Sequence, residues 1–404
     1  MGPRTSAEEL CGMESDPTQQ RALNGAERLV ARPPALIFGI PIADVTLAET
    51  LERIGGLVRD GRSHRRTHQI CTVNVDFLVN ALDDDRIATI LRDATMCLPD
   101  GMPLVWASRW LGTPIRERVA GSDLLPLLVE QSATQGWHVH VFGSAPDVAA
   151  RAERVLRERY PAARFTIEPG PIVSDVRDFD DETLDGIAAV DADVLCVALG
   201  NPKQELFIDA HRERLGIPVM IGVGGSVDMI VGEQRRAPSW MQRTGLEWLW
   251  RAGSDPRRLA PRYARDIRVF GPALAREIQR SRAGRHGAGL AVDHRDDVVD
   301  VSISPDQQLT PAAYQRAVVR LDDGNALRIT GCEAAPGTEA LAQLVGLVAV
   351  AKRGAGASWS HPGRPQWLDE SQVQAGLLPV DDGSATTKRP PSGPEDRYDG
   401  AHGD

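Results

Sequence analysis

Polar side chains with the chemistry of an active site follow two apolar runs in the first quarter of the chain. Asp100 stands in a Pro-Asp-Gly tripeptide after a short apolar run, and Thr72 and Asn74 alternate to one face of the run His68–Val75. A carboxylate at such a position can accept a proton from an attacking hydroxyl group. Aspartate is also a favoured helix N-cap and turn residue, and Asp100 taken alone favours that structural role.

A second polar group interrupts the segment Ala192–Asp228. Two apolar runs flank a stretch with helical spacing, which predicts strand, helix and strand at residues 193–199, 203–215 and 218–223. Such a unit pairs its strands in parallel through a right-handed crossover and binds ligands at their carboxyl ends. The turns Gly200–Glu205 and Gly222–Asp228 are predicted at that edge, where the amides of residues 201–203 and 223–226 suit a phosphate group.

Apolar runs and helical spacings alternate about six times along the middle of the chain. Strands are predicted at 35–40, 68–75, 96–98, 137–142 and 165–168, and helices at 46–59, 75–82, 85–93, 102–111, 124–135, 147–159 and 182–190. This alternation predicts an α/β domain with a doubly wound, Rossmann-like parallel sheet. The chain of 404 residues is long enough for a second domain, and residues 1–34 lack periodicity and are predicted to be disordered.

Several familiar signatures are absent or misplaced. No G-x-G-x-x-G opens a helix, so a nicotinamide cofactor loses its main support and no cofactor is expected. Asp191-Ala-Asp193 resembles a metal-binding pair but lies at the amino end of its predicted strand, so no metal site is predicted there. The five cysteines are widely spaced, as is typical of a reduced cytosolic protein. No apolar run reaches the roughly eighteen residues that a membrane-spanning helix needs.

Basic charge is concentrated in one segment of a chain whose net charge is −10. Residues 235–285 hold thirteen arginines, no lysine and four acids, interleaved with Trp240, Trp248, Trp250 and Tyr263. A solvated helix surface is one explanation of such a run. Arginine at this density favours the other explanation, an anionic partner that carries phosphate.

Eight motifs follow one another in a single order over residues 36–270. They are Thr72-Val-Asn74, Leu98-Pro-Asp100-Gly101, Glu117-Arg118-Val-x-Gly121-x-Asp123-Leu124, Gly143-Ser144, Gly200-Asn-Pro-Lys-Gln204-Glu205, Gly222-Val-Gly224 with Asp228, Arg236-Ala-Pro238-x-Trp240-Met, and Gly245-Leu-Glu247-Trp248-Leu. Together they resemble the WecG/TagA/CpsF family of bacterial glycosyltransferases. The resemblance implies an inverting transfer of N-acetylmannosamine or a related sugar from a UDP donor to an undecaprenyl-diphosphate-linked acceptor, in the synthesis of teichoic acid or cell-surface polysaccharide.

The resemblance also implies roles for particular residues. The family's proposed general base falls on Asp100, which outweighs the helix-cap interpretation of that residue. Arg118 suits a diphosphate charge and Gln204 suits contacts to the nucleotide, and no metal ion is implied because arginine and backbone amides can carry the leaving-group charge. The expected substrate-binding residues are Thr72, Asn74, Arg118, Gly200, Asn201, Lys203, Gln204, Glu205, Gly224 and Asp228.

Family members carry a basic carboxyl-terminal appendage, which corresponds to residues 235–282 of this chain. The spacing of five arginines groups most of them on one helical face: Arg257, Arg258, Arg262, Arg265 and Arg268. An anionic membrane attracts such a face with ~1 kcal/mol per basic residue. We therefore expect a cytoplasmic protein held peripherally at the inner face of the cell membrane, with no nucleic acid partner. After Gly224, Gly-Ser-Val-Asp228 departs from the family's Ala-x-Phe-Asp, which bears on acceptor-side packing.

The resemblance ends near Gly284, and residues 283–297 are predicted to be a linker. Predicted strands at 299–303, 326–329 and 357–359, with a helix at 338–352, make residues 298–383 a smaller α/β unit similar to a STAS domain, before a polar tail at 384–404. A docking or regulatory protein partner is expected for this unit. The alternative function is a non-catalytic UDP-sugar sensor that signals through it, but Asp100 favours the enzyme because a binding protein needs no base.

Overall fold

The computed structural model describes the chain from Arg32 to Trp359 with several gaps. The described residues are 32–171, 175–176, 179–232, 238, 241, 250, 253, 256–283, 289–295, 297–304, 308–322, 324–330, 336–353 and 357–359. The predicted disorder of residues 1–34, the polar tail and most of the motif residues between 233 and 249 lie outside the described residues, apart from Arg32–Pro34, Pro238 and Met241.

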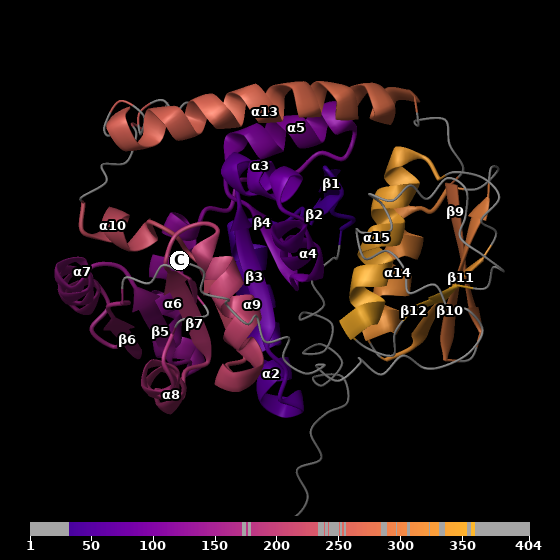
Figure 1. Ribbon diagram of the computed structural model, residues 1–404. Helices are drawn as coiled ribbons and strands as arrows, with labels where there is room; N and C mark the ends of the chain where they lie inside the picture. The colour runs from indigo at the N-terminus through magenta and orange to yellow at the C-terminus, as the bar shows by residue number, and fades with distance from the viewer. Residues whose placement is uncertain are drawn as a thin grey trace, which may run out of the picture.

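Eight strands form one large sheet that runs through the centre of the molecule (Figure 1). Their order across the sheet is β1-β2-β4-β3-β8-β7-β5-β6, and every pair is parallel except β1 with β2. The strands are β1 (Ala35–Ile37), β2 (Ile40–Ile42), β3 (His68–Val73), β4 (Met96–Pro99), β5 (Val139–Gly143), β6 (Phe165–Glu168), β7 (Val194–Ala198) and β8 (Val219–Gly222). The inner strands are buried on both faces, as their continuous apolar runs require.

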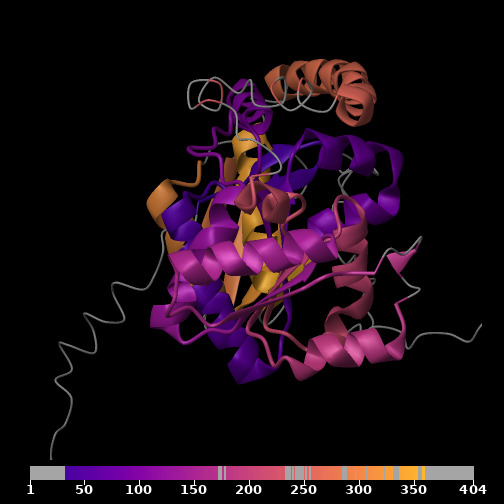
Figure 2. The same ribbon diagram turned by 90° about the vertical axis from the view of Figure 1, so that its left-hand side faces the viewer.

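Helices cover both faces of this sheet, which confirms the predicted doubly wound α/β fold (Figures 1 and 2). One face packs against α2 (Leu47–His64), α6 (Gly121–Gln135), α7 (Pro146–Arg159) and α10 (Ser226–Ile230). The other packs against α3 (Val75–Asp83), α4 (Asp85–Asp93), α5 (Met102–Leu111), α8 (Asp181–Ala189) and α9 (Lys203–Leu215). The carboxyl ends of the parallel strands therefore meet at one edge, where helices begin.

A long helix, α13 (Pro256–Ala283), lies across α5 and α3 (Figure 1). Its Phe270 and Leu274 are buried in the same apolar cluster as Ile37 and Leu111, and the Phe270 ring meets the Phe38 ring edge to face at 5.5 Å. Since its inner side belongs to the core of the sheet domain, α13 is a part of that domain.

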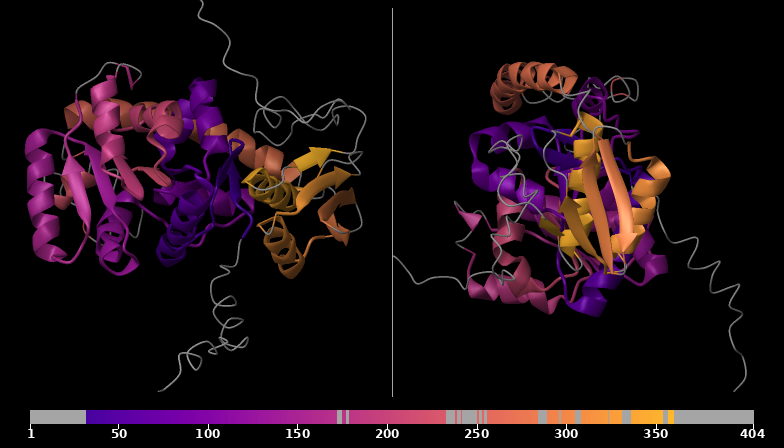
Figure 3. Two further views of the ribbon diagram at one scale, coloured as in Figure 1. Left: turned by 90° about the horizontal axis from the view of Figure 1, so that it is seen from below. Right: turned by 90° about the vertical axis from the view of Figure 1, so that its right-hand side faces the viewer.

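The chain then forms a second, four-stranded sheet beside the β1 edge of the first (Figure 3). Strand β10 (Val298–Ser304) pairs antiparallel with β9 (Gly289–Arg295) and parallel with β11 (Ala326–Thr330), which pairs parallel with β12 (Ala357–Trp359). Helices α14 (Pro311–Asp322) and α15 (Thr338–Arg353) pack on one face of this sheet. They lie between it and the large sheet (Figure 1).

The second unit differs from its prediction at two places. Residues 289–295, which were predicted to belong to a linker, form the edge strand β9. The strand was not predicted because the polar residues Asp293 and His294 interrupt its apolar pattern. Helix α14 was not predicted, although its buried residues follow helical spacing at Tyr314, Ala317, Val318 and Leu321. The unit therefore has a β-β-α-β-α-β order.

The large domain differs from its prediction at two places, the first edge strand and the start of α6. The single edge strand predicted at 35–40 is two short strands, separated by a turn in which Phe38 and Gly39 have φ of 52° and 72°. Helix α6 begins at Gly121 and not at Leu124, so the polar residues 121–123 form its first turn.

Candidate active site

The polar groups predicted from the sequence meet at the carboxyl ends of β3, β4 and β8. The Thr72 hydroxyl of β3 donates to the carbonyl oxygen of Gly222 at the end of β8 over 2.8 Å, and the backbone amide of Asp100 donates to the carbonyl oxygen of Val73 over 2.7 Å. A Cβ placed on Gly101 would lie 3.8 Å from the Cβ of Asn74. Thr72, Asn74 and Asp100 are therefore neighbours in space, as the topology predicts for adjacent parallel strands.

Asp100 is a half-buried residue at the end of β4, directly before helix α5. The N-cap of α5 is Gly101, which has no side chain that could accept a hydrogen bond from the helix terminus. Asn74, in contrast, does cap a helix, because its Oδ1 accepts from the amides of Asp76 and Phe77 at the start of α3. The N-cap position next to Asp100 is thus held by Gly101, and Asp100 stands one residue before it.

The amino terminus of α6 approaches the same place. The amide of Val119 donates to the carbonyl oxygen of Pro99 over 2.9 Å, and a Cβ on Gly121 would lie 3.5 Å from the methyl group of Thr72. The N-cap of α6 is Ala120, which offers no capping side chain. Arg118 lies beside this terminus and donates to Asp123 Oδ2 over 2.9 Å. The contact between Val119 and Pro99 thus brings the positive end of α6 close to the Pro99-Asp100 turn, and Arg118 lies beside that helix end.

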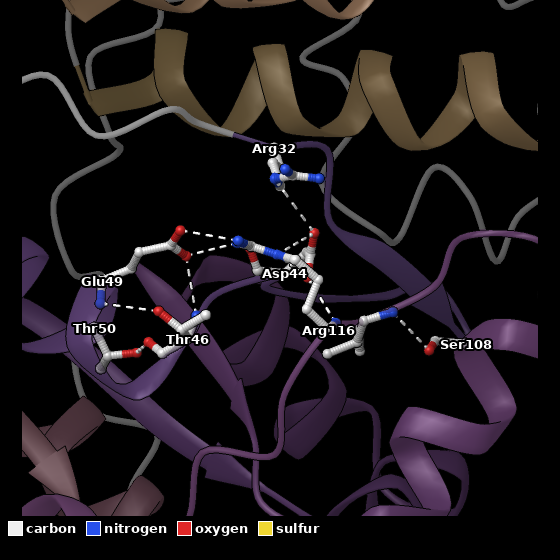
Figure 4. A network of polar contacts seen from close by, with 8 residues as sticks. Arg32, Asp44, Thr46, Glu49, Thr50, Ser108 and Arg116 are labelled. Atoms are coloured by element: carbon white, nitrogen blue, oxygen red, sulfur yellow. Dashed lines mark hydrogen bonds and ion pairs between the residues drawn. The ribbon is translucent and has the colours of Figure 1, made fainter.

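The loop that carries Arg118 is fixed by polar contacts on its far side (Figure 4). Asp44 Oδ1, just after β2, accepts from the backbone amide of Arg116 over 2.9 Å, and the Arg116 guanidinium also bonds Asp44 and both carboxylate oxygens of Glu49. Ser108 Oγ accepts from the amide of Ile115 over 3.0 Å. The hydrogen bond from Arg116 lowers the pKa of Glu49 below its ordinary value. The sequence analysis missed Arg116 and Asp44.

The turn after β8 is already occupied by internal hydrogen bonds. The amide of Val223 donates to Val197 O, that of Ser226 to Val223 O, and that of Gly224 to Gln204 Oε1 over 2.8 Å. Of the four amides predicted in this turn to face a phosphate, residues 223–226, three are therefore bonded within the protein, and the prediction is wrong for these three.

Gln204 and Glu205 lie beneath this turn and not in an open pocket. They are 1% and 0% exposed, which contradicts the expected direct contact of their side chains with a nucleotide. Gln204 Nε2 donates to Glu205 Oε1 over 2.8 Å, and burial raises the pKa of Glu205 to about 8. Glycine is required at 222 because a Cβ there would overlap the ends of both side chains.

Asn201 connects the site to α13. Its Nδ2 donates to Asp76 Oδ2 over 2.6 Å, and the Arg262 guanidinium of α13 lies 3.3 Å from the same oxygen. Burial and the nearby Asp76 charge raise the pKa of Asp266, one turn further along α13, to about 6. Asp76 and Asp266 were not predicted as functional residues, since no local pattern reveals a contact between positions so far apart in the chain.

The five arginines of α13 do not share one exposed face. Arg262 pairs with Asp76, and Arg265 donates to Asn80 Oδ1 and Asp83 Oδ2 over 2.9 and 2.7 Å. These two pair with residues of α3, and their predicted contact with a membrane stays a prediction. Arg257 and Arg268 are exposed, and the side chain of Arg258 lies outside the described residues. None of the described helices combines the length and the apolar character that a bilayer span demands.

The remaining predicted residues lie in the loops and first helical turns that follow β7 and β8. Gly200 has a φ of 79° in the turn after β7, Lys203 is exposed at the start of α9, and Asp228 is half-buried in the first turn of α10. In the described ranges no group of three or more histidine, cysteine or acidic side chains is arranged to hold a metal ion. The described site thus combines the carboxylate of Asp100 with amide, hydroxyl and basic groups and with the further acids Asp76, Asp123 and Asp228.

Comparison with known proteins shows the family of the chain. The chain is 36% identical over 190 residues to an N-acetylglucosaminyldiphosphoundecaprenol N-acetyl-beta-D-mannosaminyltransferase of Bacillus spizizenii, which covers 47% of this chain and 72% of that protein. It is 28% identical over 224 residues to the Staphylococcus aureus protein of the same name, covering 55% of this chain and 85% of that protein. The family model for the glycosyl transferase WecG/TagA/CpsF family matches residues 35–284, and the chain therefore belongs to this family.

Proposed function

We propose that the protein transfers N-acetylmannosamine, or a closely related sugar, from a UDP donor to an N-acetylglucosamine carried on undecaprenyl diphosphate, in the synthesis of a cell-surface polymer. The names of the two relatives support this acceptor and this sugar. The observation that carries the proposal is the position of Asp100, which lies between the strand ends of β3 and β8 and the uncapped terminus of α6.

Asp100 is the proposed general base. It takes the proton from the acceptor hydroxyl group as that oxygen attacks the anomeric carbon, while the bond from that carbon to the UDP oxygen breaks on the opposite face. One carboxylate is sufficient for this inverting reaction, because the diphosphate is a good leaving group once its charge is stabilised. The half-buried position of Asp100 leaves it access to a substrate hydroxyl group.

The diphosphate is proposed to lie at the amino terminus of α6, with Arg118 beside it. The helix dipole and the guanidinium both favour negative charge at this position, and Ala120 supplies no capping side chain that would compete. Thr72, Asn74, Gly200, Asn201, Lys203, Gly224 and Asp228 are proposed to complete the donor site. Gln204 and Glu205 support it from beneath.

The outward side of α13 is the proposed membrane contact. Its exposed residues include Arg257 and Arg268 together with Ala264 and Ile267, which is 59% exposed. A helix face that joins basic and apolar side chains suits an anionic lipid surface. We propose a peripheral position at the inner face of the cell membrane, where a lipid-linked acceptor is available.

The second unit is proposed to be a STAS-like docking or regulatory module for a protein partner. Its β-β-α-β-α-β order and its two helices on one sheet face support this interpretation. The alternative of a non-catalytic sensor is not favoured, since the chain belongs to a family of transferases.

The proposed function is tested by the Asp100→Asn variant, assayed for UDP release and glycolipid product from UDP-N-acetylmannosamine and a lipid-linked N-acetylglucosamine diphosphate. We expect turnover to fall by ~10²-fold or more, with little change in UDP affinity, because only the proton acceptor is lost.

The matched control is Asp93→Asn, which makes the same change at an exposed aspartate near the amino end of β4. It should turn over at the wild-type rate. Wild-type turnover in Asp100→Asn would remove Asp100 as the base, and a wild-type protein that transfers no sugar would contradict the proposed function itself.

A further inference from the structure

Glu205 is a fully buried acid that no substrate can touch in this structure. It is 0% exposed at the start of α9, and its Oε2 has no hydrogen-bond partner. An ionised carboxylate in such a place would cost several kcal/mol, so an acid without a cation beside it is retained only if it is protonated or has a function. In the part of the chain that the structure describes, no charged side chain shifts the pKa of Glu205.

The neighbours of Glu205 come from three elements. Gln204 on the same helix donates a hydrogen bond to it. Gly222 at the end of β8 packs against its side chain, and the Cys71 thiol of β3 is close enough to interact with it electrostatically. A hydrogen bond with Cys97 and burial raise the pKa of Cys71, so this neighbour is also uncharged. Glu205 is thus surrounded by neutral groups.

The consequence of the Glu205 contact is the orientation of one amide. Because Gln204 Nε2 is held by Glu205 Oε1, Gln204 Oε1 points the other way and accepts from the backbone amide of Gly224. Gly224 has a φ of 53°, which glycine adopts without strain, so the hydrogen bond from its amide to Gln204 helps to select this conformation among those open to the residue. If the Gln204 side-chain amide were flipped by 180°, its NH2 group would face the Gly224 N–H. Two donors cannot form a hydrogen bond, so the turn would lose this contact.

We infer that Glu205 is a positioning residue for the transfer reaction, acting through the Gln204 amide to hold the Gly224 turn beside the donor site. The inference rests on the proposed function, since it places this turn at the donor. It goes further by assigning the buried acid a task without any contact to substrate. The distances of 2.8 Å on both sides of the Gln204 amide carry it.

Three variants test the inference: Glu205→Gln, Glu205→Ala and, as a control, Glu213→Gln, which makes the same change at an exposed position of α9. Glu205→Gln keeps an uncharged oxygen for Gln204, so kcat/KM for the donor should stay near the wild-type value at pH 7. Glu205→Ala removes the acceptor and should lose about tenfold or more, since small misplacements at a site have effects of this size. Glu213→Gln should behave like the wild type.

The pH profile separates positioning from a merely structural role. Burial raises the pKa of Glu205 to about 8, so above that pH the carboxylate becomes ionised among neutral groups, which disfavours the buried position in which it holds the Gln204 amide. Wild-type kcat/KM should therefore fall relative to Glu205→Gln as the pH rises from 7 to 9. The ratio of the two proteins cancels the titration of Asp100, which both retain. The same relative fall in Glu213→Gln and in the wild type is expected.

Amide hydrogen exchange gives a measurement that does not depend on activity. Peptides covering residues 222–226 should exchange faster in Glu205→Ala than in the wild type and in Glu205→Gln, with circular dichroism verifying that all three are folded. Three results would each overturn the inference: equal exchange in the wild type, Glu205→Ala and Glu205→Gln; equal activity of Glu205→Ala and the wild type; or parallel pH profiles of the wild type and Glu205→Gln. An inactive wild type would overturn the proposed function, while the exchange result would still decide the role of Glu205.

Discussion

Helix α13 and the unit that follows it both pack on the sheet domain, but they attach at different places and by different contacts. Phe270 and Leu274 of α13 are part of the sheet domain's apolar cluster, and Arg262 reaches Asp76, which bonds the site residue Asn201. Helix α15 instead packs at the β1–β2 edge, where Leu36 adds to the second unit's own cluster.

The difference shows that position on the sheet, and not position in the sequence, decides whether a segment can influence the site. Strand β1 ends the sheet, and β2, β4 and β3 stand between it and β8. The family match ends at residue 284, one residue beyond α13. We therefore expect α13 to be essential for transfer and the second unit to affect transfer little.

The largest effect is expected when α13 is removed by ending the chain at Gly253. Turnover on the lipid-linked acceptor should fall by ~10²-fold or more, because the Asp76–Asn201 contact loses its Arg262 partner and the site shifts. Stability should also fall, since burial of Phe270 and Leu274 contributes about 2 kcal/mol each. Urea unfolding and a product assay measure the two effects, and a chain ending at Ala283 is the comparison. Equal turnover of the two truncated chains would show that α13 is dispensable.

The next effect concerns the Arg262 contact alone. Arg262→Ala should lower kcat/KM by about tenfold, because Asp76, whose side chain is 8% exposed, loses its basic partner. The matched control is Arg276→Ala, since Arg276 is exposed on the same helix and its side chain bonds the carbonyl of Pro272. Steady-state kinetics with varied UDP-sugar separates the two. The same activity in both variants would contradict a link between α13 and the site.

The elements of the large domain were predictable because buried parallel strands are apolar and their helices amphipathic. Helices α3 and α4 lie within one residue of their predicted ranges, and β6 and β12 match theirs. The contacts at the site were not predictable from spacing. Arg262 and Asp76 are far apart in sequence, and nothing local shows that Gln204 turns its amide inward while Lys203 stays exposed. The family resemblance identified Asp100, but only the structure shows that Gly101 is the helix cap.

A smaller effect is expected in the pH dependence of stability. Burial and the Asp76 charge raise the pKa of Asp266 to about 6, so its protonated form is favoured in the folded state. A raised pKa gives stability that is fully present below the unfolded value near 4 and is lost as the pH rises through about 6. Asp266→Asn should remove this dependence, on the order of 2 kcal/mol between pH 4 and pH 7.

Urea unfolding of the wild type and Asp266→Asn at several pH values measures this difference, with Asp93→Asn as the exposed control. If α13 separates from the domain before global unfolding, the two proteins will show the same pH dependence of the main transition. That result would break the assignment of α13 to the core of the sheet domain.

The smallest effect on catalysis is expected from removal of the second unit by ending the chain at Ala283. All the residues proposed for the site and the whole of α13 remain, so kcat/KM should stay within about threefold of the full chain. Stability should fall modestly, because Leu36 loses its apolar neighbours and Pro34 loses the close approach of Gly346, where a Cβ would lie 3.0 Å from the proline ring. Replacing Gly346 by leucine in the full chain should also lower stability without a change in turnover, because a Cβ there would overlap the Tyr314 hydroxyl group of α14 and crowd the Pro34 ring. Differential scanning calorimetry with parallel product assays measures both variants. A loss of turnover in the truncated chain that Gly346→Leu reproduces would mean that the β1 edge communicates with the strand ends after all.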